Sequence, residues 1–167
     1  MAGFVAGRAA RSEPTLDLAE QKSWYNYLAT VLRMTTVLNR QLTDLHQLTL
    51  ADVQLLEILG EAAAGSVRMG DLASSLVLLP SRLTRQVRRL EDRGLVVRAV
   101  NPQDRRCVVV TITDMGRNLL GQAMITYANA VRAYFLAPLS RPQVAATATA
   151  CRQIGEALKR PGRSGIS

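Results

Sequence analysis

The stretch that decides the fold runs from Pro80 to Gly116 and reads PSRLTRQVRRLEDRGLVVRAVNPQDRRCVVVTITDMG. Its first part has the spacing of an amphipathic helix. Pro80 suits the first turn of such a helix, and Gly94 suits the position just after its last turn. The apolar positions that share one face, and that we expect to be buried, are Leu83, Val87 and Leu90. The positions that we expect to be exposed include Ser81, Arg82, Arg85, Gln86, Arg88 and Arg89.

Beyond Gly94 the spacing of apolar residues changes to two, which predicts strands over residues 95–100 and 107–113. The segment 101–106 between them is polar and carries turn chemistry. Upstream, residues 69–76 predict a short helix, which a three-residue turn separates from the helix that begins at Pro80. Two helices joined by a short turn and followed by a β-hairpin are typical of a winged helix-turn-helix.

Positive charge is concentrated on this same stretch. The whole chain has 21 basic and 13 acidic residues, a net charge of +8 and an isoelectric point near 10.5. Residues 80–106 contain eight arginines and three acidic residues. Arginine on a helix can pair with guanine in a major groove, and arginine at a hairpin tip can reach the minor groove. The distribution therefore favours a DNA-binding surface over a charged face that only contacts solvent.

The rest of the chain predicts long helices with more apolar surface than one small winged domain can cover. An apolar seam with alternating spacings of four and three residues runs through a helix over 17–46. A helix that begins after Thr113 is expected to end at Pro138, and a last helix follows. The uncovered apolar stripes predict a homodimer. The capping residues that begin these helices are Asp17 with Glu20, Thr49 with Asp52, Thr113 with Asp114, and Ser140 with Gln143.

The predicted fold class is mainly α with a small β-hairpin wing, built from six helices and two to three short strands. The predicted parts are a disordered tail over 1–14, a dimerisation helix over 15–47, a winged helix-turn-helix DNA-binding domain over 48–113, C-terminal dimerisation helices over 114–159 and a disordered tail over 160–167. No apolar run approaches the ~20 residues that cross a bilayer. The first dozen residues lack the apolar segment of a signal peptide, so we expect a cytoplasmic protein.

The residue types that most enzymes and metal sites need are scarce. Cys107 and Cys151 are the two cysteines, too few for a disulfide framework, and His46 is the single histidine. The sequence has no phosphate-binding glycine loop and no nucleophile–base pair. We therefore predict no enzyme activity, no catalytic residues, no metal site and no cofactor.

The segments PSRLTRQVRRLEDRGLV (80–96) and NPQDRRCVVVTITDMG (101–116) resemble the recognition helix and the wing of the MarR family of bacterial transcription regulators. WYNYLATVLRMTTVLNRQLTDLHQLTLAD (24–52) is similar to that family's first helix and its junction with the second. The resemblance covers residues 17–158. It departs from the family at two turns, where Gln47 takes the place of a glycine and where the turn before Pro80 lacks the usual glycine and serine cap.

The resemblance implies a homodimer that binds a pseudo-palindromic operator in double-stranded DNA, more commonly as a repressor than as an activator. The residues expected to face bases or phosphates are Ser81, Arg82, Thr84 and Arg85. Arg88, Arg89 and Arg105 are expected to contact phosphates, which position the protein on the DNA without reading the base sequence. Arg106 would enter the minor groove, with its orientation fixed by Asp104.

Many members of this family bind a small aromatic or phenolic effector beside the dimerisation helices. The candidates here are Trp24, Tyr25, Tyr27, Met34 and Leu119, although such residues at helical spacing are more commonly core. His46 is expected to act as a cation near a helix C-terminus.

Two alternatives remain open. One is a redox-sensing regulator that uses Cys107, which follows two arginines and is expected to point away from the Val108 face, whereas Cys151 is expected to be packed. The other is a winged-helix protein-interaction module, which would have an acidic or neutral recognition helix and no wing arginines.

Overall fold

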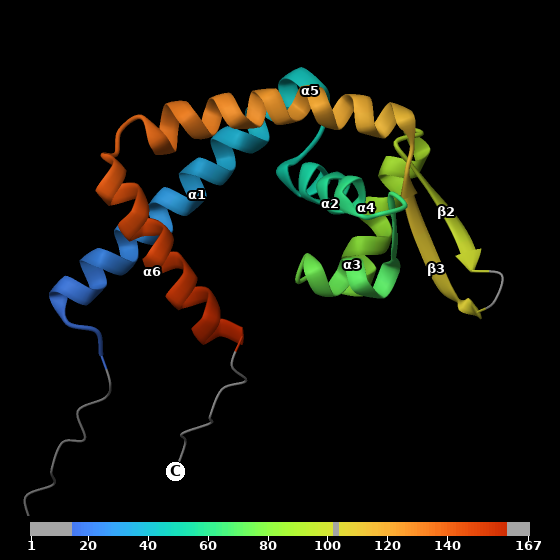
Figure 1. Ribbon diagram of the computed structural model, residues 1–167. Coiled ribbons are helices and arrows are strands. Elements are labelled where there is room, and N and C mark those ends of the chain that lie inside the picture. The colour runs from blue at the N-terminus through green and yellow to red at the C-terminus, as the bar shows by residue number, and fades with distance from the viewer. Residues whose placement is uncertain (1–14, 102–103, 160–167) are drawn as a thin grey trace, which may run out of the picture. The chain divides into compact units, whose positions relative to one another are not determined.

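The computed structural model describes residues 15–101 and 104–159, and at residues 101 and 104–106 it describes the backbone alone. The predicted fold class is confirmed (Figure 1). In chain order the elements are α1 (Leu18–His46), α2 (Leu50–Glu61), β1 (Ser66–Arg68), α3 (Met69–Ser75), α4 (Pro80–Asp92), β2 (Val96–Asn101), β3 (Asp104–Ile112), α5 (Asp114–Val131), the π-helix η1 (Arg132–Leu136) and α6 (Arg141–Lys159). No helix within the described ranges is long and apolar enough to span a membrane.

The chain divides within α1 into two units, residues 1–34 and 35–167. In the first unit the predicted cap of α1 is confirmed. The backbone N–H of Glu20 donates to Oδ1 of Asp17 at 2.9 Å, and the N–H of Asp17 donates to Oε2 of Glu20 at 2.8 Å. These reciprocal bonds satisfy N–H groups that the first turn of a helix leaves without a backbone partner.

The second unit has one hydrophobic core, formed where α2, α4 and the sheet meet the middle of α5 around Ala123. Figure 1 shows α5 along one side of α2, with α3 and α4 on the other side. Fully buried side chains come from each layer: Leu55, Leu56 and Leu59 from α2, Leu72 from α3, Leu83, Val87 and Leu90 from α4, and Val96 and Val110 from the sheet. Packing on both faces of α2 fixes the helix-turn-helix to the wing.

The sheet is antiparallel in the order β1-β3-β2. Strand β1, which pairs Val67 with Val110, was not located by the sequence because three residues carry too little periodicity. Strand β3 begins at Asp104 and not at Cys107 as predicted. Since Asn101 pairs with Asp104 across a register irregularity, the hairpin ladder extends over polar residues that the apolar alternation could not mark.

The two turns that depart from the resembled family each contain a residue with a positive φ. Gln47 (φ 55°) follows α1, and its N–H donates to the carbonyl of Thr43 at 2.9 Å. The expectation that the chain turns here without glycine is confirmed. Val77 (φ 52°) follows α3 in the turn before α4. Gly94 (φ 71°) has the same place after α4, as the sequence predicted.

The C-terminal helices differ from the prediction in detail. Regular α-helix ends at Val131, and the backbone continues as a π-helix to Leu136, so Pro138 follows the wider turn. The cap of α6 is half formed. The N–H of Ser140 donates to Oε1 of Gln143 at 2.9 Å, but the Ser140 hydroxyl also donates to that oxygen, whereas in a full capping box it would accept the backbone N–H of Gln143. Cys151, predicted to be packed, is exposed.

Candidate nucleic-acid interface

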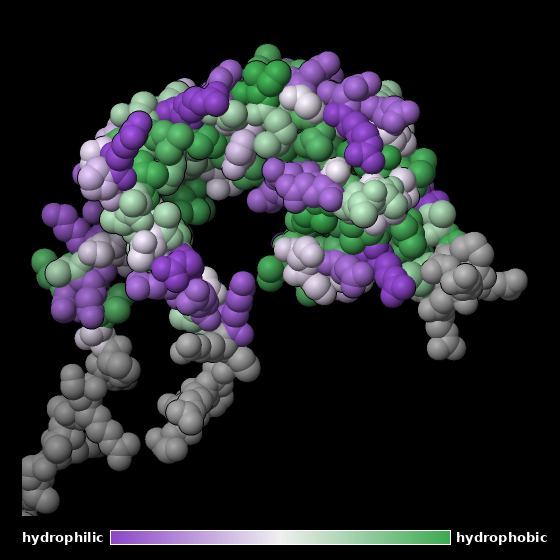
Figure 2. All heavy atoms as spheres, viewed as in Figure 1, coloured by the Kyte–Doolittle hydropathy of each residue, from purple (hydrophilic) through white to green (hydrophobic). Residues whose placement is uncertain are grey.

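Helix α4 separates its two faces as the sequence predicted, with one exception. Leu83, Val87 and Leu90 are fully buried. Ser81, Arg82, Thr84, Arg85, Arg88 and Arg89 are all exposed. On the view in Figure 2, hydrophilic side chains gather along the edge of α3 and α4 that faces away from α5. The exception is Gln86, which was expected on the exposed surface and is 8% exposed.

The reason for the burial of Gln86 is a buried carboxylate, Asp52, in the first turn of α2. Its Oδ2 accepts the backbone N–H of Thr49 at 2.9 Å and completes the predicted capping box. Its Oδ1 accepts Nε2 of Gln86 at 3.2 Å and also Nη2 of Arg89. Because both donors lie on α4, one carboxylate holds the rotation of α4 about its axis relative to the start of α2.

Two further arginines of the basic stretch also have partners within the protein. Arg93, just after α4, donates to the carbonyls of His46 and Gln47 and satisfies the C-terminal end of α1. Arg98, on β2, donates through Nε to Oε2 of Glu91 at 2.8 Å, and its backbone N–H donates to Oε1 at 3.2 Å. The Arg98 side-chain hydrogen bond holds the pKa of Glu91 below its ordinary value of 4.5.

These contacts divide the arginines of the stretch by role. Arg89, Arg93 and Arg98 link α4 to α2, α1 and β2, respectively. Arg82, Arg85 and Arg88 lie on the exposed face of α4. Among the described side chains of the stretch, the surface available to a polyanion is therefore the exposed face of α4, where arginine can approach base edges.

Asp104, Arg105 and Arg106 are the first three residues of strand β3, not part of a loop. Their side chains lie outside the described residues, as do Pro102 and Gln103. The expected orientation of Arg106 by Asp104 remains a prediction.

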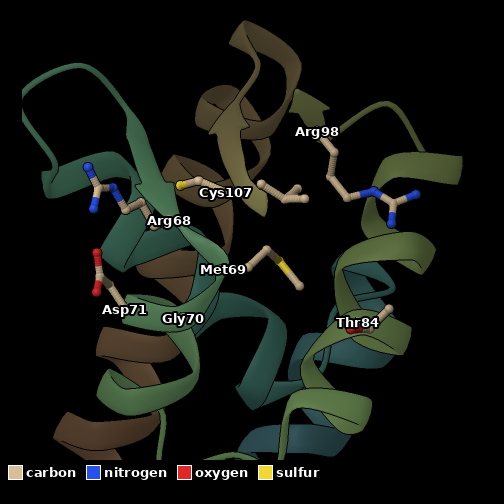
Figure 3. A pocket seen from close by; sticks show the side chains of 8 residues that line it. Arg68, Met69, Gly70, Asp71, Thr84, Arg98 and Cys107 are labelled. Atoms are coloured by element: carbon tan, nitrogen blue, oxygen red, sulfur yellow. The ribbon is translucent and has the colours of Figure 1, made fainter. Parts of the chain in front are cut away.

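A pocket of about 480 Å³ lies between α4, the start of α3 and the wing strands (Figure 3). In Figure 3 Met69 lies at its centre, Cys107 lies toward the side of Arg68, and the guanidinium of Arg98 points away from it. Thr84 lies on the α4 side, and its hydroxyl donates to the carbonyl of Pro80 at 2.8 Å. Cys107 is half-buried, and Cys151, which the sequence predicted to be packed, is exposed.

The effector candidates are divided between the two units of the chain. The rings of Trp24 and Tyr27 lie 6.0 Å apart, and Tyr25 is 65% exposed. Leu119 belongs to the second unit, where it packs against the core. His46 shares a hydrogen bond of 2.8 Å with the Thr126 hydroxyl. Among the residues that the structure describes, no group of three His, Cys, Asp or Glu side chains is arranged to hold a metal ion.

Comparison with known proteins places this winged domain in a family. The model of the MarR family matches residues 48–108. The uncharacterized HTH-type transcriptional regulator YhbI of Bacillus subtilis is 38% identical over 65 residues, which are 39% of this chain and 42% of that protein. The HTH-type transcriptional repressor MdtR, also of B. subtilis, is 25% identical over 57% of this chain and 61% of its own length. The matches thus span about half the length of these two relatives.

Two solved structures from Streptomyces coelicolor match over nearly the whole chain. The MarR family transcriptional regulator AbsC has a TM-score of 0.83 and 28% identity, covering 89% of this chain and 100% of AbsC. Sco3205, a MarR family transcriptional regulator in complex with DNA, has a TM-score of 0.85 and 28% identity, covering 93% and 97%. These relatives are transcriptional regulators and not enzymes. Residues 48–108 thus match the MarR family, and the chain as a whole has the fold of these two MarR family regulators.

Proposed function

We propose that the protein is a sequence-specific DNA-binding repressor that binds a pseudo-palindromic operator as a homodimer. The observation that carries the proposal is the exposed row of arginines on α4. Arg82, Arg85 and Arg88 face solvent, while the opposite side of the helix is held by the core and by Asp52. A fixed helix with exposed guanidinium groups has the dimensions and the chemistry to read a major groove.

Arg85 is the proposed base-reading residue, with Ser81, Arg82 and Thr84 beside it. Arg88, Arg89 and Arg105 are proposed as phosphate contacts, which set orientation and salt dependence. Arg89 would make its contact while one of its nitrogens stays on Asp52, since 54% of its side chain is exposed. Arg106 is the proposed minor-groove contact, and Asp104 its positioning partner.

The relatives agree with this proposal. Sco3205 is a MarR family regulator whose structure was solved in complex with DNA, and MdtR is a transcriptional repressor. The dimer is supported by apolar side chains that a single chain leaves exposed, among them Leu45, Ile125 and Leu158. Trp24 and Tyr27 are proposed to contact a small aromatic effector, because their neighbouring rings are half-exposed. Binding of this effector would make the protein dissociate from DNA.

The test begins by selecting operator sequences from a random duplex library with the full-length protein. Fluorescence anisotropy then gives the affinities for the selected duplex and for a scrambled duplex of equal length. In Arg85→Ala the ratio of the two affinities should fall by roughly 5- to 150-fold, because a base-edge contact is worth about 1–3 kcal/mol of discrimination.

The control variant is Arg40→Ala, which removes an 83% exposed arginine on α1 whose partner is Asp44. It should leave the ratio of specific to non-specific binding unchanged. Failure of the library to enrich any sequence would overturn the proposed function. An unchanged ratio in Arg85→Ala would instead overturn the orientation proposed for α4 in the groove.

A further inference from the structure

The turn between α3 and α4 exposes two apolar side chains in an otherwise basic neighbourhood. Val77 is 91% exposed and Leu79 is 65% exposed. Their neighbours in the chain behave differently, since Leu76 and Leu78 are half-buried and Leu72 and Leu83 are fully buried. The turn therefore contributes to the core with some of its leucines while it presents the other two apolar groups to solvent.

The backbone at Val77 makes this exposure more unusual. The N–H of Val77 donates to the carbonyl of Ser74 at 3.3 Å, and the N–H of Leu78 donates to the carbonyl of Ala73 at 3.0 Å. This pair of bonds is a Schellman motif, in which the residue at the place of Val77 is normally glycine because its φ is positive. A β-branched residue at φ 52° is strained. Strain of this kind is retained most often at functional positions.

Helix α4 ends in the same motif and shows the unstrained form. The N–H of Leu95 donates to the carbonyl of Leu90 at 3.0 Å, and the left-handed residue between α4 and β2 is Gly94, at φ 71°. The fold thus uses glycine at one end of α4, where the turn contacts the start of α5, and valine at the turn that precedes α4. Folding alone would favour glycine at both places.

The position of the turn identifies what the two side chains can meet. Leu79 is the N-cap of α4 and makes no side-chain cap bond, and Ser81 and Arg82 follow within one turn. The N-terminal residues of a recognition helix are the ones that reach base edges. In the major groove the apolar group that a base edge offers is the C5-methyl of thymine.

We propose that Val77 and Leu79 form an apolar contact surface for thymine C5-methyl groups at the edge of the operator half-site read by α4. The inference rests on the proposed function and adds a specificity element to it. The arginines of α4 read guanine edges, whereas this turn favours thymine at the adjoining positions. The side chains of the turn from Leu76 to Pro80 carry no charge, so phosphate contacts do not account for their exposure.

The experiment replaces thymine with deoxyuridine, one position at a time, in the operator selected with the full-length protein. Uracil keeps every hydrogen-bonding group of thymine and lacks only the methyl. At one or two positions in each half-site, the wild-type affinity should fall about four-fold, which corresponds to ~0.8 kcal/mol for one buried methyl. Leu79→Ala and Val77→Gly should each lose this response. Replacing thymine with uracil at the position that the missing side chain contacts should leave the affinity of that variant unchanged.

The variants and controls separate this contact from loss of folding. Val77→Gly relieves the backbone strain, so its midpoint of urea denaturation should be equal to or higher than that of the wild type. Met115→Ala removes a 53% exposed apolar side chain at the start of α5 and should retain the wild-type response to uracil.

The outcomes distinguish the inference from the proposed function. Specific binding that no thymine-to-uracil change weakens would overturn the inference and leave the proposed function intact, and the exposed turn would then be assigned to a protein partner. A uracil response that persists unchanged in both Leu79→Ala and Val77→Gly would also overturn it. If no duplex is bound specifically, both the proposed function and this inference fail.

Discussion

At the scale of single residues, Asp52 has more than one role. As an N-terminal capping residue it satisfies the Thr49 N–H, a role that the sequence revealed because both residues lie within one helical turn. Its contacts with Gln86 and Arg89 join positions 34 and 37 residues apart in the chain. No local pattern reports such contacts, and for that reason Gln86 was predicted to be exposed.

Removing the Asp52 carboxylate should therefore destabilise the protein more than loss of a cap alone. In Asp52→Ala the amide of Gln86 and one nitrogen of Arg89 lose their acceptor, and the Thr49 N–H loses its cap. We expect the free energy of unfolding to fall by roughly 2–4 kcal/mol. Urea denaturation at a fixed protein concentration measures the change.

The matched control for that measurement is Asp44→Ala on α1. Its carboxylate is 65% exposed and pairs with Arg40 at 3.7 Å, one helical turn away. Exposed pairs of this spacing contribute little, so the free energy of unfolding should stay within about 0.5 kcal/mol of the wild type. A similar loss in both aspartate variants would contradict the role given to Asp52.

At the scale of elements, helices were predicted more accurately than strands. The caps of α1, α2 and α5 and the glycine that ends α4 depend on residues within one turn, and the structure has all of them. The three-residue strand β1 and the polar start of β3 depend on partners elsewhere in the sheet. The wing was consequently predicted as a hairpin, with β2 placed within one residue of its observed bounds and β3 predicted too short.

The pair Glu91–Arg98 joins two elements, α4 and β2, and it should give the protein a pH-dependent stability. The hydrogen bond from Arg98 lowers the pKa of Glu91 below 4.5, so the carboxylate is favoured in the folded state. Its contribution is fully present above pH 4.5, the ordinary value, and is lost as the pH falls through the lowered pKa of the folded protein.

Glu91→Gln removes this dependence while keeping the size of the side chain. The difference in free energy of unfolding between wild type and variant should be largest above pH 4.5 and should shrink as the pH falls below that value. Urea denaturation from pH 3 to 7 provides the comparison, with Glu61→Gln at the end of α2 as the control for loss of one carboxylate. A difference that grows on acidification would contradict the assignment.

At the scale of the whole molecule, the division into tails, dimerisation helices and winged domain remains a prediction. The core of the second unit closes around α2, α4 and the sheet without any contribution from α6. On α6, Ile154 is 46% exposed and Leu158 is 80% exposed. A helix whose apolar side chains stay in solvent is not stabilised by packing within its own chain, which favours a second copy of the protein as its partner.

The last prediction tests that partner. At micromolar concentration the protein should sediment as a dimer, with twice the 18.2 kDa mass of one chain. Ile154→Glu should raise the dissociation constant of the dimer at least ten-fold, because a charge would be buried in an apolar interface. Gln153→Glu introduces the same charge at the neighbouring exposed position of α6 and should leave the dimer intact. Sedimentation velocity over a dilution series measures all three proteins. A folded wild-type monomer at these concentrations would contradict the homodimer, and an Ile154→Glu variant that dissociates no more readily than Gln153→Glu would exclude this face of α6 from the interface.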